Sequence, residues 1–556
     1  MNTALVSLLI GQFVLISVLS AFNPPLADGV FRKIEQRASA LATQRKFCIG
    51  VLFVLTIVLR LALMPIFEYP RPYTHDEFVY LTQADMFAHG KLAFPPHAMS
   101  RYFETFYLSF LPTYHSMYPP AQAAVLALGQ ILGNPWIGVL LSTAAMVAAA
   151  TWMLQGWFAP RWALLGGVLV LLQFGVLSYW MNSYWGGSVS ALSSCLIIGA
   201  LPRIFRGDNF PSVPLLCLAV FVLANSRPLE GFISCIPVAA VLLVKFLRNR
   251  TRRYMLQVLV PLGGTLLATV GFTLYYNWRL TGNPATLPHA VYYEQFMRVP
   301  MFLWGKVTPP LKFDNPQFDY VYNFWFFEQF NGTLSSALSI EKTKIFSFTS
   351  FYIGPWLALP LLALPCVLRD RRIRLPLMQI ALSFLGLLAV TWFHPHYAAP
   401  IFGAMVIVFM RAIWRLRSWS FCNRPIGVAG TRLIVTMLVF GTFMRVTNLA
   451  LTHNGGSCTT CLYDWDRARI AEQLRKIPGK HLVIVRYRPD HNVSREWVYN
   501  SAAIDDAQIV WAREVPGLDP APLLSYYPDR EVWLVEPDTD PPQLSPYTVN
   551  NRDGFR

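Results

Sequence analysis

The stretch YTHDEFVYL, residues 73–81, places the acids Asp76 and Glu77 a few residues after a long apolar run. A carboxylate at the mouth of a membrane helix can take a proton from a hydroxyl group, which is general-base chemistry. Thr74 and Glu77 match a capping box, which would fix the start of a helix and mount Asp76 on its first turn. Tyr80, four residues on, would share the face of Asp76. Asp76 and Glu77 are therefore the candidate catalytic pair, although the same spacing also suits a plain helix cap.

Two histidines form a second polar stretch. FHPHY, residues 393–397, sets His394 and His396 two positions apart at the top of an apolar run. Imidazoles so placed either hydrogen-bond a substrate or, with acids from another loop, bind a divalent cation. The sequence leaves the metal question open.

Aromatic residues accompany these polar groups. The stretch MNSYWGGSV offers Asn182, Tyr184 and Trp185 beside two glycines that permit close approach. Its rings suit either a platform for a sugar or isoprenoid or an ordinary interfacial belt. In TLPHAVYYEQF, His289 and Tyr293 lie on an expected surface helix that would close over the site.

These residues must be positioned by a strongly apolar chain. Of its 556 residues, 54% are hydrophobic and 14% are charged, and the mean hydropathy is +0.40. Such a composition is typical of polytopic membrane proteins and argues against a soluble multidomain protein.

The net charge of +16 is unevenly spread. Residues 453–556 hold 12 basic and 15 acidic side chains, whereas residues 1–452 hold 34 and 15. The basic residues of the apolar part form clusters between apolar runs, at 32–46, 203–206, 245–253, 369–374 and 411–432. This is the positive-inside pattern and not a nucleic-acid-binding face.

A membrane span needs roughly 20 apolar residues. The candidates are 3–22, 47–66, 136–157, 162–180, 186–205, 212–224, 231–247, 255–276, 346–368, 375–393, 396–413 and 432–450. We expect the first of them to be retained as a span, because it lacks the features of a signal peptide. If the short stretch 119–132 lies on the membrane, all basic clusters fall on one side. We therefore predict a polytopic α-helical membrane protein with about twelve spans, outer-side juxtamembrane helices and two long outer loops, 67–135 and 277–345.

Residues 453–556 have a different character. The stretches 481–487, 507–514 and 531–537 predict short strands, and 466–477 predicts a helix. We therefore expect a transmembrane domain over 1–452 and a small α/β domain outside the membrane over 453–556. Cys458 and Cys461 form a C-x-x-C motif for which a structural disulfide is the expected state, although the sequence does not determine it.

The stretch HSMYPPAQ, with His115 and Tyr118, begins the short interfacial helix. An acid pair beyond a span, a His-x-x-x-Pro-Pro element, two large outer loops and about a dozen spans resemble the membrane-embedded glycosyltransferases of the GT-C superfamily. The nearest branches are the lipid A aminoarabinose transferases and the protein O-mannosyltransferases. The resemblance covers roughly residues 47–450.

The resemblance implies transfer of a sugar from a polyprenyl-phosphate donor to a lipid, glycan or protein acceptor, with inversion at the anomeric carbon. Asp76 would be the base or would orient the acceptor. The site and the C-terminal domain would lie on the periplasmic side of a bacterial-type cytoplasmic membrane. No cofactor is required, and a divalent cation stays open.

One position departs from the family pattern. The aminoarabinose enzymes commonly carry a lysine directly before the two prolines, whereas this chain has Tyr118. A contact to the donor phosphate must then come from elsewhere. The outer-side cations are the candidates: Arg227, Arg279, Arg298 and Lys306. An arginine at a helix end can equally extend to the lipid headgroups.

The alternative from another class is a polytopic transporter or flippase of a lipid-linked or small polar substrate. The expected spans carry few ionisable residues, with Arg60 and Arg445 near span ends, whereas transporters usually need polar sites at the midplane. A non-catalytic scaffold would leave the acid pair unexplained beyond its cap. An enzyme at the membrane face is therefore the favoured interpretation.

Overall fold

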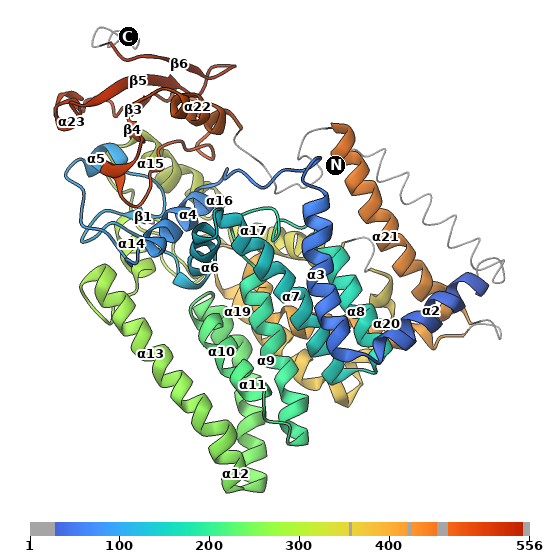
Figure 1. The fold of residues 1–556 in the computed structure, drawn as a ribbon. Helices are drawn as coiled ribbons and strands as arrows, with labels where there is room; N and C mark the ends of the chain where they lie inside the picture. The colour runs from blue at the N-terminus through green and yellow to red at the C-terminus, as the bar shows by residue number, and fades with distance from the viewer. Residues whose placement is uncertain (1–27, 355–357, 421–424, 453–464, 549–556) are drawn as a thin grey trace.

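The computed structural model describes residues 28–354, 358–420, 425–452 and 465–548, which form a helical bundle with a small sheet at one end (Figure 1). The bundle contains α2 (Asp28–Ala42), α3 (Arg45–Ala62), α7 (Pro135–Trp157), α8 (Pro160–Val170), η1 (Leu171–Gly175), α9 (Ser188–Arg206), α10 (Ser212–Ala224), α11 (Pro228–Asn249), α12 (Arg252–Tyr254), η2 (Met255–Leu259), α13 (Val260–Thr281), η5 (Leu359–Ala363), α18 (Leu364–Leu368), η6 (Arg371–Ile373), α19 (Arg374–Ala389), η7 (Pro395–Ile401), α20 (Phe402–Arg417) and α21 (Ile426–Thr452).

Seven segments of the described chain are long and apolar enough to cross a membrane: Pro135–Trp157, Ser188–Arg206, Pro228–Arg248, Arg252–Thr281, Arg371–Ala389, Pro395–Arg417 and Ile426–Leu449. The chain is therefore a multi-pass membrane protein.

The expected spans correspond to helices of unequal length. The span at 3–22 lies outside the described residues, and the stretch 212–224 forms the 13-residue α10. The described parts of the stretch 346–368, residues 346–354 and 358–368, form several short helical segments and not one helix. Pro360 and Pro365 contribute to this break, because proline has no backbone N–H to donate within a helix. The count of twelve spans stays a prediction.

The elements that hold the predicted site come from the two long loops and their neighbours. They are α4 (His75–Ala88), α5 (Ser100–Phe103), β1 (Leu108–Ser109), β2 (His115–Ser116), α6 (Pro120–Ile131), α14 (Pro288–Phe296), α15 (Pro316–Phe318), η3 (Asp319–Trp325), α16 (Phe326–Gln329), α17 (Leu334–Phe348) and η4 (Thr349–Ile353). Helices α4, α5, α14 and α15 lie between the bundle and the sheet (Figure 1).

Helix α6 is the short apolar stretch that fixed the expected topology. It has 12 residues, which is too short to cross a bilayer. It packs tightly on α7: a Cβ added to Gly138 would lie 2.1 Å from the carbonyl oxygen of Val125, and one added to Gly129 would lie 2.5 Å from the amide nitrogen of Gly138. Glycines at this crossing let the two backbones approach, so α6 is held rigidly at the end of the bundle.

The C-terminal sheet has the strand order β4-β3-β5-β6. Its elements are α22 (Trp465–Lys476), β3 (Lys480–Val485), η9 (Ile504–Asp506), β4 (Ile509–Arg513), α23 (Ala521–Tyr526), β5 (Arg530–Glu536) and β6 (Gln543–Pro546). Strand β3 pairs in parallel with β4 and β5, and β6 pairs antiparallel with β5. The three predicted strands and the predicted helix are confirmed, and β6 was missed. The domain boundary at 452/453 stays a prediction, and Cys458 and Cys461 lie outside the described residues.

Both faces of the parallel strand β3 are buried, as is typical of parallel strands. Along β3, Val483 and Val485 pack toward α22. The alternate residues Leu482 and Ile484 pack toward α4 and join a core cluster with Phe78. Since side chains alternate between the two faces of a strand, one strand serves both cores. The sheet therefore shares a hydrophobic core with the loop that carries the acid pair.

Candidate functional site

The predicted capping box at the start of α4 is confirmed. Thr74 is the N-cap in extended conformation, and Glu77 closes back on it. The amides of Tyr73 and Thr74 donate to Glu77 Oε2 at 3.0 and 3.2 Å. The cap places Asp76 on the first turn of the helix.

Glu77 also joins α4 to the turn at residues 181–187. The amide of Tyr184 donates to Glu77 Oε1 at 3.0 Å. The carboxyl is 4% exposed, and burial raises its pKa to about 7 in spite of the hydrogen bonds it accepts. Glu77 is thus the buried link between two segments of the site.

Asp76 is half-buried and meets Tyr118 from the segment before α6. The phenol of Tyr118 donates a short hydrogen bond to Asp76 Oδ1. The rings of Tyr80 and Tyr118 stack with centroids 4.8 Å apart. Tyr118, which stands directly before the two prolines, therefore contacts the candidate base.

Tyr107 was missed by the sequence interpretation. It has a positive φ of 63°, which is a strained backbone conformation for a bulky residue. Its amide donates to the hydroxyl of Tyr292 at 2.7 Å, and its ring lies 5.9 Å from that of Tyr118. Burial, followed by the charge of Asp76, raises the pKa of Tyr107 well above its ordinary value. No local sequence pattern indicates that Tyr107 lies beside the candidate base.

Arg227 precedes the first turn of α11, where Pro228 starts the helix. Its guanidinium lies 4.1 Å from the centre of the Tyr397 ring. The charges of Arg227 and Asp76 both act on Tyr80 and on His394. The structure therefore brings a cation and a carboxylate to the same group of side chains.

Trp185 and the two histidines complete one side of this group. The ring of Trp185 lies 4.7 Å from His394 and 5.5 Å from His396, and its indole N–H donates to Thr74 Oγ1. Tyr179 holds His396 through a 3.1 Å hydrogen bond to Nδ1. In the described part of the chain, no three His, Cys, Asp or Glu side chains are grouped so as to hold a metal ion.

Helix α14 covers another side. His289 stacks on Tyr293 with ring centroids 4.5 Å apart. The hydroxyl of Tyr292, on the same helix, accepts a hydrogen bond from the amide of Tyr107 at 2.7 Å, so α14 lies beside this group. We name the residues brought together here the Asp76 cluster: Asp76, Tyr80, Tyr107, Tyr118, Trp185, Arg227, His289, Tyr293, His394, His396 and Tyr397.

The other predicted residues lie elsewhere. His115 is fully buried. Its Nδ1 lies 2.8 Å from the carbonyl oxygen of Thr113, at hydrogen-bond distance. The hydroxyl of Tyr184 donates to the carbonyl of Pro70 at 3.0 Å. Arg279 is exposed on the last turn of α13. These positions support the surrounding loops or face outward.

Asn182 supports a buried arginine. Arg60 of α3 donates to Asn182 Oδ1 at 2.8 Å and to the carbonyls of Phe67 and Glu68 at 2.9 and 2.8 Å. An arginine inside an apolar run is costly, so it signals a specific partner. Arg60 ties the segment leading to α4 to the turn that carries Trp185.

Comparison with known proteins gives structural matches. No family model matches, and no curated protein matches. ArnT from Cupriavidus metallidurans in the apo state has a TM-score of 0.48 and 14% identity over 87% of this chain and 92% of its own. The same protein bound to undecaprenyl phosphate has a TM-score of 0.45 and 13% identity, with coverages of 90% and 93%.

An oligosaccharyltransferase from Archaeoglobus fulgidus, tethered to an acceptor peptide, has a TM-score of 0.45 and 11% identity over 83% of this chain. The match spans 64% of that enzyme, which is less than two thirds of its length. Because these TM-scores lie below 0.5, the chemistry must be argued from the residues of this chain.

Proposed function

We propose that this protein is a glycosyltransferase that moves a sugar from a polyprenyl-phosphate donor to an acceptor at the outer face of the cytoplasmic membrane. The observation that carries the proposal is one connected group of side chains that contains both Asp76, bonded to Tyr118, and Arg227, which lies over Tyr397. It is joined through contacts of Tyr397 with His394, of His394 with Trp185, and of Trp185 with the N-cap of α4. A lipid carrier would keep its isoprenoid among the helices while its sugar reaches the cluster.

The residue types suit this reaction. The acceptor hydroxyl attacks the anomeric carbon, and its proton passes to Asp76. The bond between the anomeric carbon and the phosphate oxygen breaks as the new C–O bond forms, and the electron pair leaves with the phosphate. Arg227 would stabilise that negative charge. Attack opposite the leaving group inverts the anomeric centre.

Tyr118 explains how the site can work without the family lysine. Its phenol holds Asp76 in one orientation by donating to Oδ1. The phosphate contact then falls to Arg227, whose guanidinium faces a ring and forms no ion pair with a carboxylate in the described part of the chain. His394, His396, His289 and Tyr293 are assigned to substrate contacts.

Glu77 has a different role in this scheme. Four protein groups donate to its carboxylate: the amides of Tyr73, Thr74 and Tyr184, and the Thr74 hydroxyl. A carboxylate so occupied is a poor proton acceptor for a substrate. We therefore assign Glu77 to positioning Asp76 and Trp185.

Mass spectrometry of envelope glycans and glycolipids tests the proposal. Cells lacking the protein are complemented with wild type or with Asp76→Asn at matched membrane levels. A species one sugar heavier should return with wild type and not with the variant. If both variants restore it equally, Asp76 is only part of a helix cap. If wild type restores nothing, the transferase proposal is wrong.

A further inference from the structure

Helix α4 presents two functional faces. On the first face, Asp76 accepts a hydrogen bond from Tyr118 and Tyr80 stacks on its ring. Gln83, on the same face, donates to the carbonyl of Tyr118 at 2.9 Å. The other face carries residues 75, 78, 82 and 85, which recur at the three- and four-residue spacing of a single helical stripe. The orientation of that second face sets the direction of Asp76.

The second face is held by residues 499–502 of the C-terminal region, which we name the tail clamp. His75 Nδ1 and the Tyr499 hydroxyl are 3.0 Å apart. The rings of Phe78 and Tyr499 stack at 4.5 Å with an interplanar angle of 3°. These contacts fix the first turn of α4, on which Asp76 stands.

The clamp continues along the helix. Thr82 Oγ1 donates to the carbonyl of Asn500 at 3.2 Å, and the amide of Ala502 donates to Asp85 Oδ2 at 2.7 Å. One tail segment therefore contacts α4 at all four positions of the stripe, over nearly its whole length.

The clamp is itself fixed to the sheet. The side chain of Asn500 donates to the carbonyl of Trp511 and accepts from its amide, each at 2.8 Å. Arg467 of α22 donates to the carbonyl of Tyr499 at 2.9 Å while its guanidinium lies 4.8 Å from the centre of the Phe78 ring. The clamp is thus held to β4 and to α22 by hydrogen bonds.

We propose that the C-terminal sheet is a working part of the catalytic unit and that Tyr499 is a positioning residue, which sets the orientation of Asp76 through His75 and Phe78. The inference rests on the proposed function. A displacement of a reacting group by about 1 Å can cost roughly 100-fold in rate. Loss of the Tyr499 hydroxyl, with its ring retained, should therefore slow the reaction while leaving donor affinity nearly intact.

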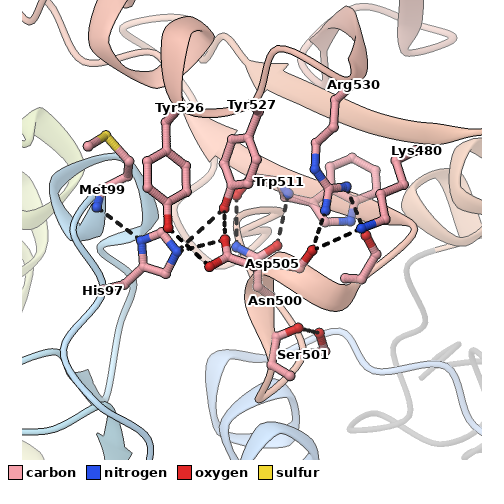
Figure 2. Close-up of polar contacts among 12 residues, drawn as sticks. His97, Met99, Lys480, Asn500, Ser501, Asp505, Trp511, Tyr526, Tyr527 and Arg530 are labelled. Atoms are coloured by element: carbon pink, nitrogen blue, oxygen red, sulfur yellow. Dashed lines mark hydrogen bonds and ion pairs between the residues drawn. The ribbon is translucent and has the colours of Figure 1, made fainter.

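A second tail tyrosine provides a matched control. Tyr527 also links the tail to the 67–135 loop, because its hydroxyl donates to Asp505 and lies 3.4 Å from His97 Nε2 (Figure 2). Asp505 also accepts from Tyr526 at 3.1 Å. This group makes no hydrogen bond to α4 within the described residues. Tyr527→Phe removes a hydroxyl oxygen from the same interface, as Tyr499→Phe does, and leaves the hydrogen bonds of the clamp in place.

The test compares full-length wild type, Tyr499→Phe, Tyr527→Phe and Asp76→Asn in membranes. The probe is a lipid extract of the deletion strain, in which donor and acceptor accumulate. We expect Tyr499→Phe to lower the maximal rate about tenfold, with the half-saturating extract concentration changed less than twofold. Amide hydrogen exchange should become faster in α4. Tyr527→Phe should match wild type in both measurements.

If Tyr499→Phe gives poor membrane yield, Thr82→Val removes the clamp bond one turn further on and should show the same split. If Asp76→Asn is inactive while Tyr499→Phe and Thr82→Val keep wild-type rates, the clamp is structural only and the proposed function stands. If Asp76→Asn is fully active, the assigned base is wrong, and the positioning role falls with it.

Discussion

Three arginines at one end of the helical bundle and Arg227 at the other have different partners. At the end away from the sheet, Arg417 and Arg432 pair with Glu35 of α2, and Arg411 pairs with Asp370 (Figure 1). At the sheet end, Arg227 lies over the Tyr397 ring and forms no ion pair with any of the described residues. An arginine in an ion pair links two helices, whereas the role proposed for Arg227 is to bind an anion. Under the proposed function, the comparison contrasts structural arginines at one end with a substrate-binding arginine at the other.

The largest effect should come from the acids. Asp76→Asn should reduce sugar transfer by roughly 100- to 10,000-fold, because the base is lost. Asp370→Asn at the other end should keep the rate and lower the melting temperature. Initial rates and thermal unfolding in the same membranes check both. A large loss of rate in the Asp370 variant would break the division between the two ends.

The arginines should show the next largest effect. Arg227→Gln should lower the maximal rate by about 100-fold, as for removal of a group that stabilises developing negative charge. Arg411→Gln should leave the rate near wild type and reduce stability. Single-turnover rates give the measurement. Equal losses in the two variants would mean that Arg227 is a structural cation like Arg411.

Removal of a hydroxyl should have a smaller effect. Tyr118→Phe deletes the hydrogen bond to Asp76, and a typical hydrogen bond contributes about 0.5–1.5 kcal/mol, so we expect a loss of roughly two- to tenfold. Tyr254 donates to the carbonyl of Leu242 at 3.2 Å at the other end, and Tyr254→Phe should leave the rate unchanged. Unchanged rates in both variants would show that Tyr118 does not orient the base.

The two ends should also differ in the sign of their pH dependence. Burial raises the pKa of Glu77 from 4.5 to about 7, so its stabilising contribution is complete below 4.5 and is lost as the pH rises through 7. Burial would raise the pKa of Glu35 as well, but hydrogen bonds from Arg432 and Arg417 lower it below 4.5. The contribution of Glu35 is therefore lost as the pH falls through this lowered pKa.

Melting temperatures between about pH 5 and about pH 8 measure this difference. Relative to wild type, Glu77→Gln should become more stable as the pH rises. Glu35→Gln should keep a nearly constant difference from wild type over this range, because the pKa of Glu35 lies below 4.5 in the folded protein. A Glu77→Gln difference that does not change with pH would contradict the raised pKa.

Much of the local structure could be predicted from the sequence. The capping box at Thr74 and Glu77 is formed, and the strands around 481–487 and 531–537 are present because their alternation and β-branched residues are local signals. The apolar composition of 346–368 predicted one span, whereas its prolines are a local signal for interruption of a helix that the prediction did not use.

The partners of the site residues could not be predicted in the same way. Tyr118 and Asp76 are 42 residues apart in the chain, and His75 and Tyr499 are 424 apart. No periodicity relates residues at such separations, because their contact depends on how whole elements pack. The roles of Tyr107 and Arg60 were missed for the same reason.

The sequence by itself determined the membrane character of the chain, the start of α4, the strands of the tail and the residue types available for chemistry. These follow from hydropathy, capping and alternation, which act over a few residues. The tertiary structure alone decided that Tyr118 would face Asp76, that Arg227 would meet a ring and not an acid, and that the tail would hold α4. Those outcomes depend on packing between distant segments, where burial removes water and leaves each polar group to the partner that the fold provides.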